Sequence, residues 1–369
     1  MVAGARPGIK PLLREQVPLA PFTTLGVGGP ARFVIEATDP DLVPRAIDWA
    51  AARQLPLFVL GGGSNIVVAD SGFDGLVLRI AVKGLDTSEE SDRVTVSAGA
   101  GEEWDDLVSF SVERGWAGLE CLSGIPGTVG GTPVQNVGAY GQEVGETIAS
   151  VAAVDRATGQ VVDIDRSACE FGYRTSRFKG RDRDRFVITS VRYHLRPNGR
   201  PTIIYPDVRS YLARCGPPAP SIADVRAAVI AIRRRKGMIV DPEDADSRSV
   251  GSFFVNPLVT RDELDRLLRT RARTPDTVPA FPAAGGFFKL SAAWLIEAAG
   301  FPRGYAAGNV GLSTRHAMAI VNRGGATAAE VVGLAAEIVA RVGDLFDVEL
   351  RPEPVFVGFD PGTLPWSRE

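Results

Sequence analysis

The segment that most constrains the fold of this chain runs from Gly124 to Gln142 and holds six glycines, two prolines and no charged residue. Glycine loses more backbone freedom on folding than any other residue, so this many glycines in one segment need a local reason. The usual reason is a ligand with phosphate groups, because uncovered backbone N–H groups can bind its oxygens. The segment therefore predicts a loop that binds an anionic ligand.

A second glycine loop lies upstream, where Leu-Gly-Gly-Gly-Ser-Asn (60–65) separates two apolar runs. Both runs, 56–60 and 66–69, have the pattern of short strands. Because a strand and not a helix follows the loop, it does not fit the dinucleotide fingerprint G-x-G-x-x-G, and the chain has no G-x-x-x-x-G-K-[ST] motif. Alone, the loop is as typical of a tight turn as of a diphosphate site. Beside the longer segment, the diphosphate interpretation is the better one.

Composition and charge exclude several classes of function. The 369 residues are 45% hydrophobic and 23% charged, which is typical of a globular chain of two or three domains. A net charge of −3 gives no general attraction to nucleic acid or to an anionic membrane. No apolar run reaches the roughly 18 residues of a transmembrane helix, and residues 1–10 lack the apolar core of a signal peptide. Three widely spaced cysteines are typical of reduced thiols in a cytosolic protein, and two histidines without a Cys-x-x-Cys motif argue against a metal site.

Hydrophobic periodicity predicts alternating strands and helices in the first two hundred residues. We expect one helix from Asp39-Pro40 to about Arg53 and another over 102–114, ending at Gly115. The polar stretch 86–92 predicts a turn. Strands are expected at 31–37, 56–60, 65–70, 75–80, 93–98, 150–157, 160–164 and 186–195.

A compositional break rich in Pro, Gly and Arg occupies 197–220 and precedes a region of capped helices. The pattern predicts a helix over 224–236, because Ser221 and Asp224 have the spacing of a capping box. Three further helices are expected to begin at Thr260, Ser291 and Thr327. A strand is expected at 316–322, and the chain ends with an alternating run at 347–358.

Five motifs, taken in order, make the chain recognisable. They are Gly-Gly-Gly-Ser-Asn (61–65), Gly-Ile-Pro-Gly-Thr-Val-Gly-Gly with Gln-Asn-Val-Gly-Ala-Tyr-Gly (124–141), Phe-Gly-Tyr-Arg-Thr-Ser-Arg-Phe-Lys (171–179), Gly-Ser-Phe-Phe-Val-Asn-Pro (251–257) and Leu-Arg-Pro-Glu-Pro (350–354). Over residues 18–358 the chain resembles the UDP-N-acetylenolpyruvoylglucosamine reductases, flavoenzymes of bacterial cell-wall precursor synthesis. Any one motif could arise by chance, but the five together are highly specific.

The resemblance implies an α+β fold from the superfamily of vanillyl-alcohol-oxidase-like flavoproteins. Two FAD-binding subdomains are expected, at 1–80 and 81–220. A C-terminal α+β substrate-binding domain is expected at 221–369, with the segment near 347–358 returning to the active site. This division agrees with the one that the pattern of expected elements and the compositional break place at about 80 and about 220, and it explains why the glycine loops do not follow the Rossmann pattern.

The resemblance also implies which residues bind FAD. The diphosphate would lie on the backbone of the two glycine loops, and the residues from Asn136 to Tyr140 would lie near the ribityl chain and the flavin ring. Because neither loop contains a histidine to form a covalent bond, we expect a dissociable FAD. The residues so implied are Gly61, Gly62, Gly63, Ser64, Asn65, Gly124, Ile125, Pro126, Gly127, Gly130, Asn136, Gly138, Ala139 and Tyr140.

Three residues are implied to be catalytic. Ser252 matches the proton donor of the family, although the residue pattern alone is that of an ordinary strand or loop serine. Arg174 and Glu353 match the groups that stabilise negative charge on the carboxylate side of the substrate; without the resemblance they would be interpreted as part of a solvated basic edge and as a turn glutamate. His316 precedes an apolar strand, and a half-buried structural histidine is the better interpretation.

Three more residues are implied to bind the UDP part of the substrate, namely Tyr205, Lys236 and Asn256. Lys236 follows Arg233-Arg234-Arg235 at the end of a predicted helix, where basic side chains complement the helix dipole. A nucleic-acid patch is the rival interpretation of this run, and the lack of interleaved aromatic residues weakens it. The segment 237–250 is longer than in some family members.

The expected function is the NADPH-dependent reduction of UDP-N-acetylglucosamine enolpyruvate to UDP-N-acetylmuramate through FAD, by a cytoplasmic monomer with no metal, no membrane partner and no nucleic acid. Two alternatives stay open. One is an FAD-dependent oxidase of the same superfamily, which oxygen would reoxidise rapidly. The other is a non-enzymatic nucleotide-binding or nucleic-acid-binding protein, which would purify without colour and bind polyanions with a steep salt dependence.

Overall fold

The computed structural model describes residues 9–269, 278–360 and 362–366, which form two units. The first unit contains residues up to 17, 31–63 and 74–235. The second contains 18–30, 64–73 and the chain from 236 onward. Two short N-terminal segments therefore belong with the C-terminal third of the chain, which no local pattern in the sequence indicates.

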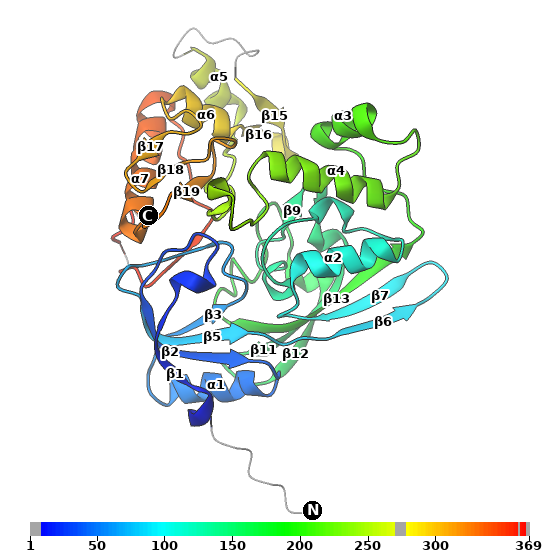
Figure 1. The fold of residues 1–369 in the computed structure, drawn as a ribbon, viewed down its shortest axis with the longest axis vertical. Coiled ribbons are helices and arrows are strands. Elements are labelled where there is room, and N and C mark those ends of the chain that lie inside the picture. Colours follow the sequence, from blue (N-terminus) through cyan, green and yellow to red (C-terminus); the bar gives the residue numbers. More distant parts are fainter. Residues whose placement is uncertain (1–8, 270–277, 361, 367–369) are drawn as a thin grey trace, which may run out of the picture. The chain divides into compact units, whose positions relative to one another are not determined.

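The first unit contains a four-stranded sheet, and Figure 1 shows its strands with α1 beside them. One face of α1 (Leu42–Ala51) is buried in the same core as strand residues such as Leu76 and Leu78. The helix begins two residues later than expected, because the Asp39 carboxylate accepts a hydrogen bond from the Asp41 N–H at 2.9 Å and forms a turn. The strand order is β1 (Arg14–Pro18), β2 (Pro30–Ala37), β5 (Phe73–Ile80), β3 (Leu57–Leu60).

The first unit also contains a six-stranded sheet, with α2 (Trp104–Glu113) packed into the same core. The path through the sheet is β12 (Val161–Asp165), β11 (Ile148–Asp155), β13 (Phe186–Pro197), β7 (Val94–Gly99), β6 (Leu85–Glu89), and β8 (Trp116–Ala117) pairs with β13. The turn expected at 86–92 is wrong over most of its length, because β6 pairs with β7. All five side chains of β6 are exposed, so no apolar alternation marks this edge strand.

Two helices of the first unit lie after the sheets. α4 (Ile222–Arg235) buries an apolar stripe that includes Val225, Val229 and Ile232, and its predicted cap is confirmed by a hydrogen bond from Ser221 N–H to the Asp224 carboxylate at 2.8 Å. The break expected at 197–220 is wrong in part, because it contains α3 (Pro206–Cys215). The described part of α3 buries Val208 and Leu212, too few apolar positions to give a helical signal.

In the described part of the second unit, short strands accompany three α-helices. α6 (Ala292–Ala298) and α7 (Ala328–Phe346) begin at the predicted caps, and α5 (Arg261–Arg269) follows Thr260 as predicted. One sheet has the order β14 (Leu258–Val259), β16 (Phe288–Leu290), β15 (Ala280–Pro282), and another has the order β17 (Ala306–Ala307), β18 (Val310–Leu312), β19 (Ile320–Asn322). β19 is shorter than the predicted strand because residues 316–319 form a turn.

The N-terminal segments complete the core of the second unit. β4 (Ile66–Val68) pairs in parallel with β20 (Val355–Val357), the described strand within the alternating run. The Asp70 carboxylate accepts hydrogen bonds from the first two N–H groups of α7, at 2.8 and 2.9 Å. Leu25 and Val27 are buried in the same cluster as the apolar face of α7.

Among the described residues, none of the helices is both long enough and apolar enough to span a membrane.

Short elements connect these parts. The remaining elements are the hairpin β9 (Gly138–Ala139) and β10 (Gln142–Glu143) and the 3-10 helices η1 (Lys10–Leu12), η2 (Ala20–Phe22), η3 (Glu120–Leu122), η4 (Val129–Gly131), η5 (Val144–Glu146), η6 (Arg166–Cys169), η7 (Ala245–Ser247) and η9 (Ala284–Gly286).

Candidate active site

The two predicted glycine loops lie against each other in the first unit. A Cβ atom added at Gly62 would lie 2.6 Å from the Cα of Gly127, and one added at Gly61 would lie 2.9 Å from the hydroxyl oxygen of Thr128. Carbon atoms do not approach this closely, so the backbones can meet only because both loops carry glycine here. The structure therefore brings together two segments that are more than sixty residues apart in the sequence.

This junction presents a group of unused hydrogen-bond donors. Within the described residues, the backbone N–H groups of Gly62, Gly63, Ile125, Gly127 and Thr128 donate no hydrogen bond. The Thr128 hydroxyl is buried and also has no partner among them. Gly63 and Thr128 are buried, Ile125 and Gly127 are half-buried, and Gly62 is exposed. Buried polar groups in native proteins are almost always satisfied, so the donors of Gly63 and Thr128 indicate a ligand with acceptor oxygens, and the neighbouring N–H groups can bind the same ligand. A diphosphate fits this arrangement.

The other predicted FAD-binding residues of the two loops lie around this junction, and some of the glycines have a structural role. The N–H of Gly130 donates to the carbonyl oxygen of Ala100 at 2.9 Å, and a Cβ at Gly130 would lie 2.6 Å from the Ala100 Cβ. Gly124 is held on both sides, as described below. Pro126 has no N–H to donate. Ser64 and Asn65 continue the first loop and are counted with the second unit.

Gly124 is fixed by α2 and α4. Its N–H donates to the Asp105 carboxylate at 2.6 Å, and Arg226 binds the same carboxylate through two nitrogens at 2.6 and 2.9 Å. Its carbonyl oxygen accepts from Nε of Arg233 at 3.1 Å. Burial raises the pKa of Asp105, but the hydrogen bonds from Arg226 and Gly124 outweigh burial and hold the pKa below its usual value. No local sequence pattern predicts this frame of Asp105, Arg226 and Arg233 around Gly124.

Arg233 occupies a different place from the one expected for a basic helix end. Its side chain is only 6% exposed, and burial lowers its pKa. Arg234 and Arg235 are exposed, and Lys236 directly follows the end of α4 and is half-buried. The run is therefore not one uniform charged surface.

The side chain of Asn136 is used within the protein. Its Nδ2 donates to the Glu143 carboxylate at 2.7 Å and to the carbonyl oxygen of Gly172 at 3.0 Å, and its Oδ1 accepts from the N–H of Gly145 at 2.9 Å. It is 2% exposed and has a φ of +47°. Asn136 therefore connects the long glycine segment to the turn that carries Arg174.

Arg174 lies at the tip of that turn. Gly172 and Thr175 exchange hydrogen bonds at 3.1 and 3.2 Å, and Arg174 between them has a φ of +55°. A left-handed conformation is unfavourable for arginine, so the neighbouring contacts must hold it. The half-buried guanidinium thus belongs to a constrained turn beside the predicted flavin segment, within the same unit.

Two predicted aromatic residues meet in the first unit. Tyr140, after the β9 strand that contains Gly138 and Ala139, has a φ of +48°. Its ring meets the ring of Tyr205 edge to face, with the centroids 5.4 Å apart. Tyr205 is 41% exposed and stands at the N-cap position of α3. The residues predicted for the flavin and for the nucleotide thus form one aromatic pair.

In the second unit, Ser252 and Glu353 lie on neighbouring segments. The N–H of Glu353 donates to the carbonyl oxygen of Phe253 at 2.8 Å, and Phe254 pairs antiparallel with Pro352. The side chains of Phe253 and Phe254 are fully buried, which anchors the motif, whereas Ser252 and Glu353 are only half-buried. The pairing brings together two candidates that are about a hundred residues apart in the sequence.

Ser252 has a partner that the sequence did not reveal. Its hydroxyl oxygen lies 3.1 Å from Nε2 of His316. His316 is half-buried as expected, but the structural interpretation missed this contact, because no local pattern connects residues 64 positions apart. Asn256 accepts from the N–H of Ala292 at 2.9 Å through Oδ1, and within the described chain its Nδ2 has no partner.

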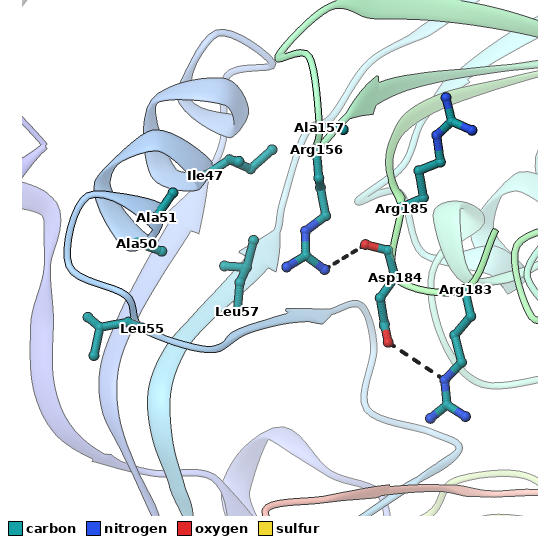
Figure 2. A pocket seen from close by; sticks show the side chains of 10 residues that line it. All are labelled: Ile47, Ala50, Ala51, Leu55, Leu57, Arg156, Ala157, Arg183, Asp184 and Arg185. Atoms are coloured by element: carbon teal, nitrogen blue, oxygen red, sulfur yellow. Dashed lines mark hydrogen bonds and ion pairs between the residues drawn. The ribbon is translucent and has the colours of Figure 1, made fainter.

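A cavity of about 430 Å³ lies elsewhere in the first unit, between α1 and an arginine-rich turn (Figure 2). Ile47, Leu55 and Leu57 line one side. On the other side Arg156 donates to the carbonyl oxygen of Asp184 at 2.7 Å. None of the predicted site residues lines this cavity, so it is separate from the candidate site.

Similarity to known proteins agrees with the geometry. Residues 31–165 match the family described as FAD binding domain, and residues 241–357 match the C-terminal domain of UDP-N-acetylenolpyruvoylglucosamine reductase. The chain is 47% identical to the UDP-N-acetylenolpyruvoylglucosamine reductase of Thermobifida fusca over 351 residues, covering 93% of this chain and 98% of the relative. It is 46% identical to that of Mycobacterium tuberculosis over 358 residues, covering 94% and 95%.

A solved structure gives the same result. The crystal structure of the UDP-N-acetylenolpyruvylglucosamine reductase from Thermus caldophilus matches with a TM-score of 0.63 at 26% identity, covering 94% of this chain and 99% of that one. The predicted FAD-binding fold with a separate C-terminal domain is thereby confirmed. The chain belongs to the UDP-N-acetylenolpyruvoylglucosamine reductase family, as its five motifs predicted.

Proposed function

We propose that this chain reduces the enolpyruvyl group of UDP-N-acetylglucosamine enolpyruvate to give UDP-N-acetylmuramate, with NADPH as the electron donor and FAD as the cofactor. The observation that carries the proposal is the junction of the two glycine loops, with its five unused N–H donors and a buried, unpaired threonine hydroxyl. In a member of this family, such a donor set suits the FAD diphosphate.

The residues of the first unit would hold the cofactor. The N–H groups of Gly62, Gly63, Ile125, Gly127 and Thr128 would bind the diphosphate oxygens, and the frame around Gly124 would keep the long loop in place. When bound, FAD would supply the hydride chemistry that links NADPH to the terminal carbon of the enol ether. No histidine lies in either loop, so the cofactor would be held without a covalent bond.

The chain's own part in the reduction is to supply a proton and to stabilise charge. Hydride addition at one carbon leaves an electron pair on the neighbouring carbon, next to the substrate carboxylate. The Ser252 O–H would protonate that carbon, and Arg174 and Glu353 would stabilise the enolate-like intermediate before protonation. The constrained turn of Arg174 supports this role, because a pre-positioned guanidinium loses little freedom when it binds a carboxylate.

The UDP part of the substrate would be bound by Tyr205, Lys236 and Asn256. Asn256 is suited to this role because its Oδ1 is engaged at the start of α6 and its Nδ2 is available to a ligand. The exposed ring of Tyr205 offers a surface on which a nucleotide can stack. We further propose a cytoplasmic monomer; the described cysteines are free thiols, which suits a reducing compartment.

The test separates the two half-reactions under anaerobic conditions. The purified holoenzyme is reduced with NADPH, which should bleach the flavin absorbance, and UDP-N-acetylglucosamine enolpyruvate is then added, which should restore it. Recovery of the colour together with formation of UDP-N-acetylmuramate supports the function. If the flavin absorbance is bleached by NADPH but does not recover with the enol ether, the substrate assignment is wrong. Rapid recovery of the absorbance with oxygen alone would favour an oxidase.

The role of Ser252 is tested in the same assay. Ser252→Ala should leave reduction by NADPH within about twofold of the unmodified enzyme and slow the recovery step by about 10²–10⁴-fold, the usual contribution of a general acid. Ser88→Ala, on the exposed strand β6, is the control and should change neither step. Equal losses in both half-reactions of Ser252→Ala would contradict its assigned role.

A further inference from the structure

The contact between Ser252 and His316 has a chemical consequence. A serine hydroxyl is a weak acid, and donating its proton leaves negative charge on Oγ. A hydrogen-bond donor at that oxygen favours the charged form and also fixes the direction of the O–H bond. The Nε2 atom of His316, at 3.1 Å from Oγ, is placed to be such a donor.

The backbone holds these two residues in register. The N–H of Phe253, directly after Ser252, donates to the carbonyl oxygen of Met318 at 2.7 Å. The N–H of Ala319 donates to the carbonyl oxygen of His316 at 3.1 Å and closes the turn between them. The histidine is therefore carried on a short turn that is bonded to the serine segment itself.

The segment 237–250, noted above for its length, holds the same turn from the other side. Nε of Arg315 lies 3.0 Å from the Asp246 carboxylate, and its guanidinium also binds Asp244. The N–H and hydroxyl of Thr314 donate to Asp246 at 3.1 and 2.6 Å. The two residues before His316 are thus fixed by two carboxylates, although the first of these residues is exposed.

We propose that His316 is a positioning residue for proton donation by Ser252, an inference that rests on the proposed function. The Nε2–H donates to Ser252 Oγ and directs the serine O–H toward the substrate carbon. In the step, the O–H bond of Ser252 breaks and a C–H bond forms with the electron pair on that carbon. The remaining oxygen charge is stabilised by Nε2–H until a water molecule returns a proton.

Substitutions of His316 by side chains of different length test the proposal. A glutamine side chain can place its amide nitrogen close to the position of Nε2, whereas asparagine is too short and alanine has no donor. In the anaerobic assay, His316→Gln should keep the recovery step within about threefold of the unmodified enzyme. His316→Asn and His316→Ala should slow it by about 10- to 100-fold, the effect of losing one hydrogen bond to a charged group. Reduction by NADPH should change by less than about twofold in all three.

A double-mutant cycle distinguishes positioning from a structural role. If His316 acts through Ser252, adding His316→Ala to Ser252→Ala should slow recovery no further. Independent, multiplying losses would overturn the proposal, as would equal rates for the Gln and Asn variants. If His316→Ala does not retain FAD, the comparison of the recovery rates of His316→Gln and His316→Asn still tests the proposal. If His316→Asn recovers the flavin absorbance at the rate of the unmodified enzyme while Ser252→Ala recovers it slowly, only this inference is overturned. If the unmodified, reduced enzyme does not react with the enol ether, the proposed function is overturned and this inference with it.

Discussion

Replacing Gly62 by alanine should weaken FAD binding while the matched change at Gly131 should not. A Cβ at Gly62 would lie 2.6 Å from the Cα of Gly127 and 3.2 Å from the nitrogen of Thr128, both of them backbone atoms. To reach the 3.4 Å at which ordinary contacts begin, the two loops must separate by 0.8 Å. The backbone of Gly62 does not have a positive φ, so the effect comes from the contact alone.

The size of the effect follows from the hydrogen bonds at stake. A separation of 0.8 Å takes an N–H···O distance of about 2.9 Å beyond the range of a hydrogen bond. Each bond to a charged oxygen contributes about 1.5–3 kcal/mol, so the loss of one or two bonds gives about 3 kcal/mol. That corresponds to a Kd for FAD raised by about 100-fold.

The assay is a titration of the apoprotein with FAD, followed by the quenching of flavin fluorescence. Gly131 is the control because an added Cβ there would meet nothing within 4 Å and the residue is exposed. Gly131→Ala should bind FAD with the same Kd as the unmodified chain. Unchanged binding by Gly62→Ala, or equal weakening by both variants, would refute the assignment of the loop junction to the diphosphate.

Three further predictions concern stability and reactivity. In the unmodified chain, the lowered pKa of the Asp105 carboxylate adds stability above its unfolded value of 3.8, and this stability disappears as the pH falls. In Asp105→Asn, the free energy of unfolding from urea titrations should therefore decrease less between about pH 5 and 3. An unchanged pH profile would contradict this. Cys215 alone should react rapidly with a thiol reagent at pH 8, because it is exposed, whereas burial raises the pKa of Cys121 to about 12 and that of Cys169 to about 11. A second thiol that reacts rapidly would be inconsistent with this burial. Thr327→Ala should lower the free energy of unfolding by about 1 kcal/mol, as expected for an N-cap, and no change would mean that water replaces the capping bond.

The sequence predicted the family, the FAD-binding fold and the starts of the capped helices, because each rests on local signals. Glycine loops, capping pairs and apolar stripes are readable over a few residues. The boundaries of the three expected domains and the individual binding and catalytic roles stay predictions. The two sheets built from residues 14–80 and 85–197 lie in one unit, so the expected division into two FAD subdomains stays a prediction.

What the sequence could not show depends on contacts between distant residues. The edge strand 85–89 has no apolar side, so pairing with its neighbour alone makes it a strand. Asp105 looks like any acid in the first turn of a helix until Gly124 and Arg226 are seen to share it. The sequence indicated a structural role for His316, because the contact that gives it a chemical role comes from a serine 64 residues earlier.

The parallel pairing of Ile66–Val68 with Val355–Val357 affects how the chain can fold during synthesis. About 290 residues separate the two strands, and a ribosome adding 5–20 residues per second needs roughly 15–60 s to make the second after the first. Leu25, Val27 and Val67 belong to a core whose next described member along the chain is Val250, so their other buried partners are made only after that point. The nascent enzyme thus carries exposed hydrophobic segments until the region from Val250 onward is made, and chaperones that bind such segments should matter more for its yield than for chains whose cores are contiguous in sequence.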